Sequence, residues 1–182
     1  MMHLPQQRTG LARTATVPTS AIDPGPKRRH SARVAQFSRD PVGLLHLDTY
    51  SVDDVSVRAI SAAVCTDFGV ATPQFKFNAR RSPYTGACER SRSSWVELLG
   101  ESAVATREAN GWGSLPQDGA IRLGRRTTLM TLAHELGHHA VFHLDPPNTP
   151  AHGRAWVLRF DQAAWLVRDA TGVGEDWLLS TT

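Results

Sequence analysis

A glutamate flanked by two histidines has the spacing of a metal site that activates water. His134 and His138 are four residues apart, and Glu135 completes an HExxH pattern. At about 100° of rotation per residue, a helix places these two imidazoles on one face, one turn apart, so that both can reach a single ion. A carboxylate beside such a pair can act as general base toward a zinc-activated water. The pattern therefore predicts Zn²⁺ on His134 and His138, with Glu135 as the catalytic residue.

The third metal ligand must come from outside this pattern, because a catalytic zinc usually takes three protein ligands and keeps one position for water. Asp145 would face the correct side of the helix but about two turns further along, whereas His143 would lie on the packing side. Asp161 would be deep inside the next helix. We favour His152, which is expected in the first turn of that helix, and keep Asp145 and Asp161 as alternatives.

The helix that carries this site should begin at a cap on Thr127 or Thr128 and continue to about Leu144, before the breaker Asp145-Pro146-Pro147. Gly137 is costly inside a helix and indicates close approach by another element. His139 projects about 100° away from His138, so we expect it at the edge of the site or in solvent. The face opposite the metal ligands should pack on the core through Leu129, Leu132, Ala133, Leu136, Ala140 and Leu144.

The next helix should have Thr149 as its cap and Pro150 at its first position, and should stop near Gly172. Earlier in the chain, Ser51 followed by Asp54 predicts another capped helix, which ends at Gly69. Its apolar stripe would consist of Val52, Val55, Ala59, Ile60, Ala63, Val64 and Phe68.

Strands are expected between these helices. After Pro73, the alternation of Phe75, Phe77 and Ala79 with polar residues predicts a half-buried strand, and Ala120 to Leu123 predicts a second, short one. Between them we expect a connection over Arg80 to Arg92 and a loop over Asn110 to Gly119. The apolar runs Trp95 to Leu99 and Ala103 to Thr106 could form a hairpin around Gly100.

Composition limits the remaining possibilities. The 182 residues, of which 41% are hydrophobic, are enough for one core. Residues 1–41 are rich in Pro, Ser, Thr and Arg and are expected to form a disordered basic arm, with residues 42–182 as the folded domain. Although the net charge is +3, residues 1–40 hold seven basic groups against Asp23 and Asp40, so any contact with nucleic acid would begin in this arm.

The two cysteines, Cys65 and Cys88, fit no metal clip, and both are expected to be free thiols, with Cys65 in the core. The alternative is a single disulfide between them in an oxidising compartment. The sequence has no long apolar run and no apolar export segment, so we expect a cytoplasmic protein without a membrane-spanning segment. It does not predict the oligomeric state.

HELGHH, followed by His152-Gly153-Arg154-Ala155-Trp156, resembles the SprT-like zincins and a related small family of HExxH metallohydrolases. The resemblance covers about Ala120 to Phe160, and Ser51 to Arg80 only in the order of elements. It implies an α+β, zincin-like fold in which a small antiparallel or mixed sheet packs on the HExxH helix and a following helix carries the third ligand. It also implies that His134, His138 and His152 bind zinc and that Glu135 catalyses.

The function expected from these patterns is a zinc metallopeptidase that acts on a peptide or protein substrate. SprT proteins of crosslink repair usually add a zinc ribbon, but this chain has no CxxC pair, so that role is not transferred. HELGHH also resembles ImmA/IrrE regulatory peptidases, which rank second because their downstream acidic-Ala-Asn pattern is missing. The same residues would also suit a hydrolase of small amides, or a non-catalytic zinc module that binds nucleic acid through its basic arm.

Overall fold

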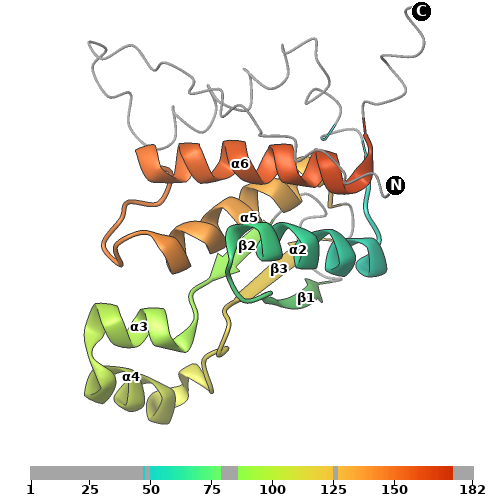
Figure 1. Ribbon diagram of the computed structural model, residues 1–182. Helices are drawn as coiled ribbons and strands as arrows, with labels where there is room; N and C mark the ends of the chain where they lie inside the picture. Colours follow the sequence, from blue (N-terminus) through green and yellow to red (C-terminus); the bar gives the residue numbers. More distant parts are fainter. Residues whose placement is uncertain (1–46, 48–49, 79–85, 125–126, 174–182) are drawn as a thin grey trace, which may run out of the picture.

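The computed structural model describes residue 47 and residues 50–78, 86–124 and 127–173, and the predicted basic arm, residues 1–41, lies outside them. Within these residues the protein has an α+β architecture (Figure 1). A three-stranded sheet has the order β1-β3-β2, with β1 parallel and β2 antiparallel to the central strand β3. The expected small mixed sheet is therefore confirmed.

Helix α2 spans Asp54–Phe68 and ends at Gly69, whose left-handed conformation gives the expected stop. Its cap is Asp53, not Ser51, because the Asp53 carboxylate accepts a hydrogen bond of 2.7 Å from the Ser56 amide. The predicted apolar stripe was wrong in part, since Val55 is 78% exposed. The residues that α2 buries are Val57, Ile60, Ser61, Val64 and Cys65. The stripe is therefore rotated from its predicted position, although Cys65 is in the core as expected.

In β1 (Gln74–Asn78) Phe75 is buried and Phe77 half-buried, between exposed Gln74 and Lys76. The central strand β3 (Ala120–Gly124) is buried throughout except at Arg122, which is half-buried. Phe75 is paired with Ile121, and Phe77 with Leu123, on the side that faces the core. Both predicted strands are confirmed, but Ala79 lies outside the described residues. The predicted connection after β1 was wrong in part, because it contains the edge strand β2 (Gly86–Glu89).

Three short helical segments between β2 and β3 form an arm that extends from the rest of the fold (Figure 1). They are α3 (Arg92–Leu99), α4 (Glu101–Arg107) and η1 (Glu108–Trp112). The predicted hairpin was wrong: the Ser91 hydroxyl caps α3 by accepting from the Ser94 amide, and Gly100, at φ 84°, separates two helices instead of two strands. The predicted loop begins only after η1.

Helices α5 (Leu129–Leu144) and α6 (Arg154–Thr171) complete the fold. Thr128 caps α5 as expected, with its hydroxyl accepting from the Thr131 amide at 3.2 Å. Helix α5 packs on β2, and α6 packs on α5 and α2, on the side away from the sheet (Figure 1). The predicted stop of α6 at Gly172 is confirmed. Its predicted start was wrong, because Thr149 and Pro150 lie in turns that precede the helix.

The core lies between the sheet and the helices, and Ile121, Leu132, Leu136, Trp156 and Phe160 are among its fully buried side chains. Leu144, expected on the packing face of α5, is instead 41% exposed. Both cysteines are free. Among the described helices, none is both long and apolar enough to span a lipid bilayer.

Candidate metal centre

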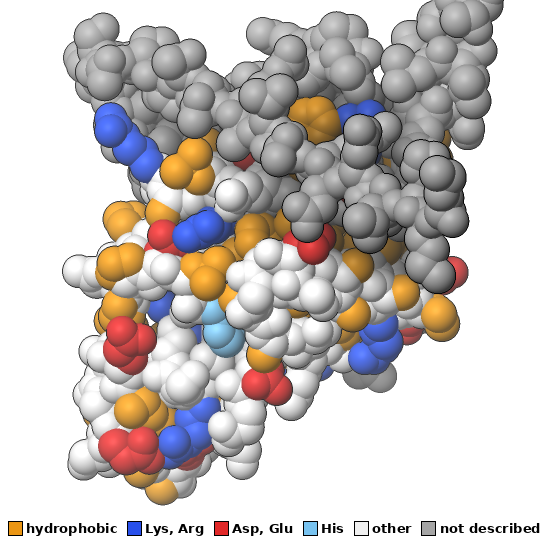
Figure 2. Space-filling view, in the orientation of Figure 1, with side chains coloured by type: hydrophobic (Ala, Val, Ile, Leu, Met, Phe, Trp, Pro, Cys, Tyr) orange, Lys and Arg blue, Asp and Glu red, His pale blue; other side chains and the backbone are white. Residues whose placement is uncertain are grey.

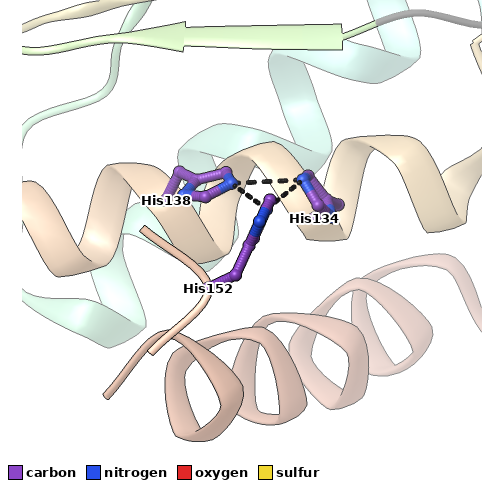
Figure 3. Close-up of side chains that lie close together, drawn as sticks. All are labelled: His134, His138 and His152. Carbon is purple, nitrogen blue, oxygen red and sulfur yellow. Dashed lines mark hydrogen bonds between the residues drawn. The ribbon is translucent and has the colours of Figure 1, made fainter. Parts of the chain in front are cut away.

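Three histidines from two parts of the chain meet at one point (Figure 3). The Nε2 atom of His138 lies 3.1 Å from Nε2 of His134 and 3.0 Å from Nε2 of His152, and the remaining pair is 3.4 Å apart. His134 and His138 come from successive turns of α5, whereas His152 reaches them from the segment before α6. The three residues selected from the sequence as metal ligands are thus brought together, close enough to hold a metal ion.

The separations of these nitrogens fit a tetrahedral zinc ion. Zn–N bonds of about 2.0–2.1 Å at tetrahedral angles place neighbouring ligand nitrogens about 3.3 Å apart. Each neutral imidazole has one proton and one lone pair, so three Nε2 atoms that face one another cannot all be satisfied by mutual hydrogen bonds. A cation that accepts all three lone pairs removes this conflict, and the donor set therefore fits a metal.

His152 is positioned by two turns and by an uncommon backbone conformation. The Thr149 amide donates to the Pro146 carbonyl and the Gly153 amide to the Pro150 carbonyl, each at 2.9 Å. His152 has φ 59°, which is unfavourable for a residue with a Cβ and prevents a helix from running through it. The residue predicted as third ligand therefore precedes α6 and does not belong to its first turn, which corrects the position inferred from the sequence.

Close packing of α5 on α6 brings His152 to His134 and His138. A Cβ on Gly137 would lie 3.0 Å from the Cα of Phe160, so the glycine allows the helices to approach, as its unfavourable propensity indicated. The ion pair between Asp145 and Arg159, at 2.9 Å, joins the end of α5 to α6. Backbone contact in the middle and an ion pair at the end thus fix how the helices align.

A buried tryptophan supports all three imidazoles. The ring centroid of Trp156, which is fully buried, lies 5.0, 5.5 and 4.6 Å from those of His134, His138 and His152. Phe160 stacks on the tryptophan, with centroids 4.9 Å apart, and its ring is also 5.8 Å from that of His134. The histidine rings therefore pack against an apolar, rigid surface, which limits the rotation of their side chains.

Glu135 lies beside the histidines but points toward the sheet. Its Oε1 atom is 3.9 Å from Nε2 of His134, and the residue is only 4% exposed. Burial raises the pKa of the Glu135 carboxyl to about 8. A cation at the histidines would favour the ionised form, which is the form that can accept a proton. Gly86 of β2 leaves the room for this side chain, since a Cβ there would be 2.5 Å from Oε1.

The remaining candidates lie elsewhere. Asp145 is paired with Arg159, and Asp161 is not part of the three-histidine group. His139 is fully buried instead of solvated and donates a hydrogen bond of 2.7 Å from Nε2 to the Ala71 carbonyl. Burial lowers its pKa to about 4, so it remains neutral. His139 therefore anchors α5 to the segment before β1, and the ring of His143 lies against it at a tilt, with centroids 4.5 Å apart.

The sequence did not indicate the roles of Gly86 and Trp156. Gly86 falls in a stretch expected to be a connection, where a glycine has many ordinary explanations. Trp156 falls within the helix predicted to stop near Gly172, but its contact with three histidines depends on the packing of α6. Its only signal was its position four residues after His152.

Comparisons with protein-family models, curated proteins and solved structures found no match to this chain.

Proposed function

We propose that the protein is a zinc-dependent hydrolase, and most specifically a metallopeptidase. The observation that carries this proposal is the convergence of three imidazole nitrogens within 3.0–3.4 Å of one another, beside a buried carboxylate. Three neutral ligands leave an ion its full positive charge and one open position, as in catalytic zinc sites. The resemblance of the HELGHH segment to SprT-like zincins supports the same assignment.

When bound, zinc supplies the Lewis acid that makes water a nucleophile near neutral pH and polarises the substrate carbonyl. Glu135 accepts the proton of the attacking water and returns it to the leaving amine. Its location beside His134, at 3.9 Å, suits this role better than coordination, because its carboxylate faces β2. Trp156 keeps the three imidazoles oriented and excludes water from their buried side.

The proposal is tested by metal analysis of the purified chain and by hydrolysis of a mixed peptide library. We expect one zinc per chain, cleavage that stops on chelation, and restoration by added Zn²⁺. Glu135→Gln should retain the metal and lose at least about 100-fold in rate, because general base catalysis contributes about 10²–10⁴. Glu97→Gln, an exposed change on α3, serves as the matched control and should remain active. A wild-type chain without stoichiometric metal, or an active Glu135→Gln variant, would refute the proposal.

A further inference from the structure

Strand β2 runs along the metal-binding helix, and the same face of this segment contacts α5 at two separate places. Gly86 lies against Glu135, and Arg90, which directly follows β2, places its guanidinium carbon 4.2 Å from the ring centroid of Phe142. Residues 86 and 90 are an even number of positions apart and therefore point to the same side of an extended chain. Arg90 is thus located further along α5 than the catalytic carboxylate.

Phe142 connects this arginine to the metal ligands. It lies one helical turn after His138, which itself lies one turn after His134, so the three side chains form one row on α5. The rings of Phe142 and His138 are stacked, with centroids 6.1 Å apart. The Arg90 guanidinium therefore lies over the aromatic ring that follows His138 in this row.

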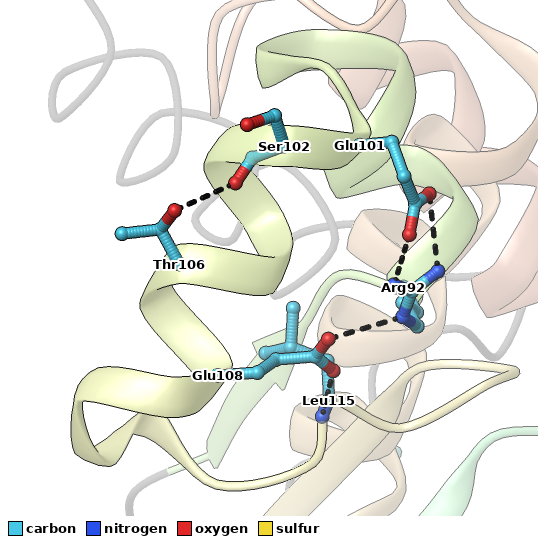
Figure 4. A network of polar contacts seen from close by, with 6 residues as sticks. All are labelled: Arg92, Glu101, Ser102, Thr106, Glu108 and Leu115. Carbon is cyan, nitrogen blue, oxygen red and sulfur yellow. Dashed lines mark hydrogen bonds and ion pairs between the residues drawn. The ribbon is translucent and has the colours of Figure 1, made fainter.

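Arg90 carries a partly buried positive charge that has no carboxylate partner among the described residues. Arg92, two residues later, pairs with Glu101 and Glu108, which ties α3 to the rest of the arm (Figure 4). Arg90 instead donates a hydrogen bond of 3.1 Å to the Ser94 hydroxyl, and no carboxylate of the described residues pairs with it. Its partial burial lowers the pKa of the guanidinium. Arg90 is therefore a partly desolvated cation whose charge is not neutralised within the described structure.

We infer that Arg90 is a specificity-determining residue that binds a carboxylate of the substrate on the His138 side of the metal. This inference rests on the proposed function, because the metal and Glu135 define where the scissile bond lies. An extended peptide advances about 3.4 Å per residue, so a carboxylate one or two residues from that bond can reach the guanidinium. The planar guanidinium, which lies over the Phe142 ring, can present two parallel N–H donors to a carboxylate. His134 and His152 are only partly buried, so a substrate can reach them from solvent. Figure 2 shows a histidine side chain at the surface between the arm and the helical layer.

The carboxylate could belong to an acidic side chain or to the C-terminus of a peptide. Two sets of labelled peptides separate these sources. One set has blocked ends and carries Asp or Glu against Asn or Gln at each position, and the other has a free against an amidated C-terminus. Binding is measured by fluorescence anisotropy on the zinc-loaded full chain carrying Glu135→Gln, which prevents turnover. Hydrolysis of the same peptides is measured in parallel with the chain that retains Glu135.

We expect one of the two sets to show about tenfold tighter binding of the carboxylate peptide, since charge-assisted bidentate pairs are the stronger ones. Arg90→Gln should reduce this preference to less than about twofold. Arg90→Met, which keeps an aliphatic contact with Phe142, should do the same and guards against a folding defect of the first variant. Arg168→Gln is the matched control, because Arg168 also stacks on an aromatic ring, that of Trp165 at 5.0 Å, but near the far end of α6.

Three results would overturn the inference. They are the absence of a carboxylate preference in both sets, a preference that is retained in both Arg90 variants, and a preference that Arg168→Gln reduces as much as the Arg90 variants do. Its failure is distinguishable from failure of the proposed function. Hydrolysis without a preference for carboxylate peptides would support the proposed hydrolase function but would refute the role of Arg90 in substrate recognition. Binding that depends on Arg90 but is not followed by hydrolysis would support Arg90 as the carboxylate-binding residue and refute the proposed hydrolase activity.

Discussion

Gly86 on β2 lies directly against the carboxylate of Glu135 on α5, so that a Cβ at residue 86 would stand 2.5 Å from Oε1 and 2.7 Å from Cγ. Gly86→Ala should therefore push the Glu135 side chain out of position while the three histidines remain in place. A displacement of about 1 Å in a catalytic group can cost about 100-fold in rate. We expect a loss of that order in peptide hydrolysis, with zinc content unchanged.

Ala87→Val is the matched control for this prediction. It adds methyl groups to the neighbouring residue of the same strand, but on an exposed position. Full activity in Gly86→Ala would mean that Glu135 tolerates displacement, and the close contact would then have no functional importance.

His152 has two separable effects: its imidazole is a predicted zinc ligand, and its left-handed backbone is unfavourable for any residue with a Cβ. His152→Ala and His152→Gly both remove the ligand, so both should lose stoichiometric zinc at low micromolar metal. Because φ is 59°, the glycine variant should be more stable by about 1 kcal/mol than the alanine variant in urea unfolding of the metal-free chain. His143→Gln, outside the triad, should keep its zinc. Equal stability of the two His152 variants would contradict the observed backbone conformation.

Gly137→Ala tests the contact between α5 and α6. Alanine gains about 1 kcal/mol in helix propensity, but its Cβ would lie 3.0 Å from Phe160 Cα, which is backbone and cannot rotate away. Overpacking of this kind costs about 1–3 kcal/mol, so we expect a net loss of stability in urea unfolding. Zinc affinity should fall as well, because α6 and the preceding His152 would move away from α5. A variant more stable than wild type would show that the helices are not in tight contact.

Acid should weaken the cap of α2. The hydrogen bond from the Ser56 amide lowers the pKa of the Asp53 carboxyl below its ordinary value of 3.8. The folded state therefore favours the ionised form, and the stabilisation is present above about pH 4 and lost as the pH falls through the folded pKa. Asp53→Ala should lower the free energy of unfolding at neutral pH, and its difference from wild type should shrink as the pH falls below about 4. Urea titrations across this range measure the effect, and a constant difference would exclude an ionised cap.

Local patterns were sufficient for the elements whose ends carry strong signals. Thr128 begins α5, and Gly69 and Gly172 end α2 and α6, because capping hydroxyls and left-handed glycines act within a few residues. The HExxH spacing selected His134 and His138 for the same reason, since one helical turn determines where both rings lie.

Where a residue's role depends on distant neighbours, the patterns failed. Thr149 and Pro150 have the composition of a helix start, yet the turn that positions His152 delays α6 to Arg154. The apolar runs on either side of Gly100 are compatible with strands as well as with helices. The Ser91 cap favours the helix α3, which the structure contains. Gly86 gains its importance only when β2 pairs with β3 and meets α5, which no local pattern encodes.

The placement of the third imidazole in the link between α5 and α6 has a mechanical consequence. His138 and His152 are 14 positions apart, so an ion held by both closes a short loop, much as a disulfide would. Cross-linking a loop of about this length removes chain entropy worth about 3 kcal/mol from the unfolded state. Metal coordination would thus act as a reversible cross-link that stabilises the packing of α6 on the rest of the protein. The stability of that packing would then depend on the concentration of the metal ion.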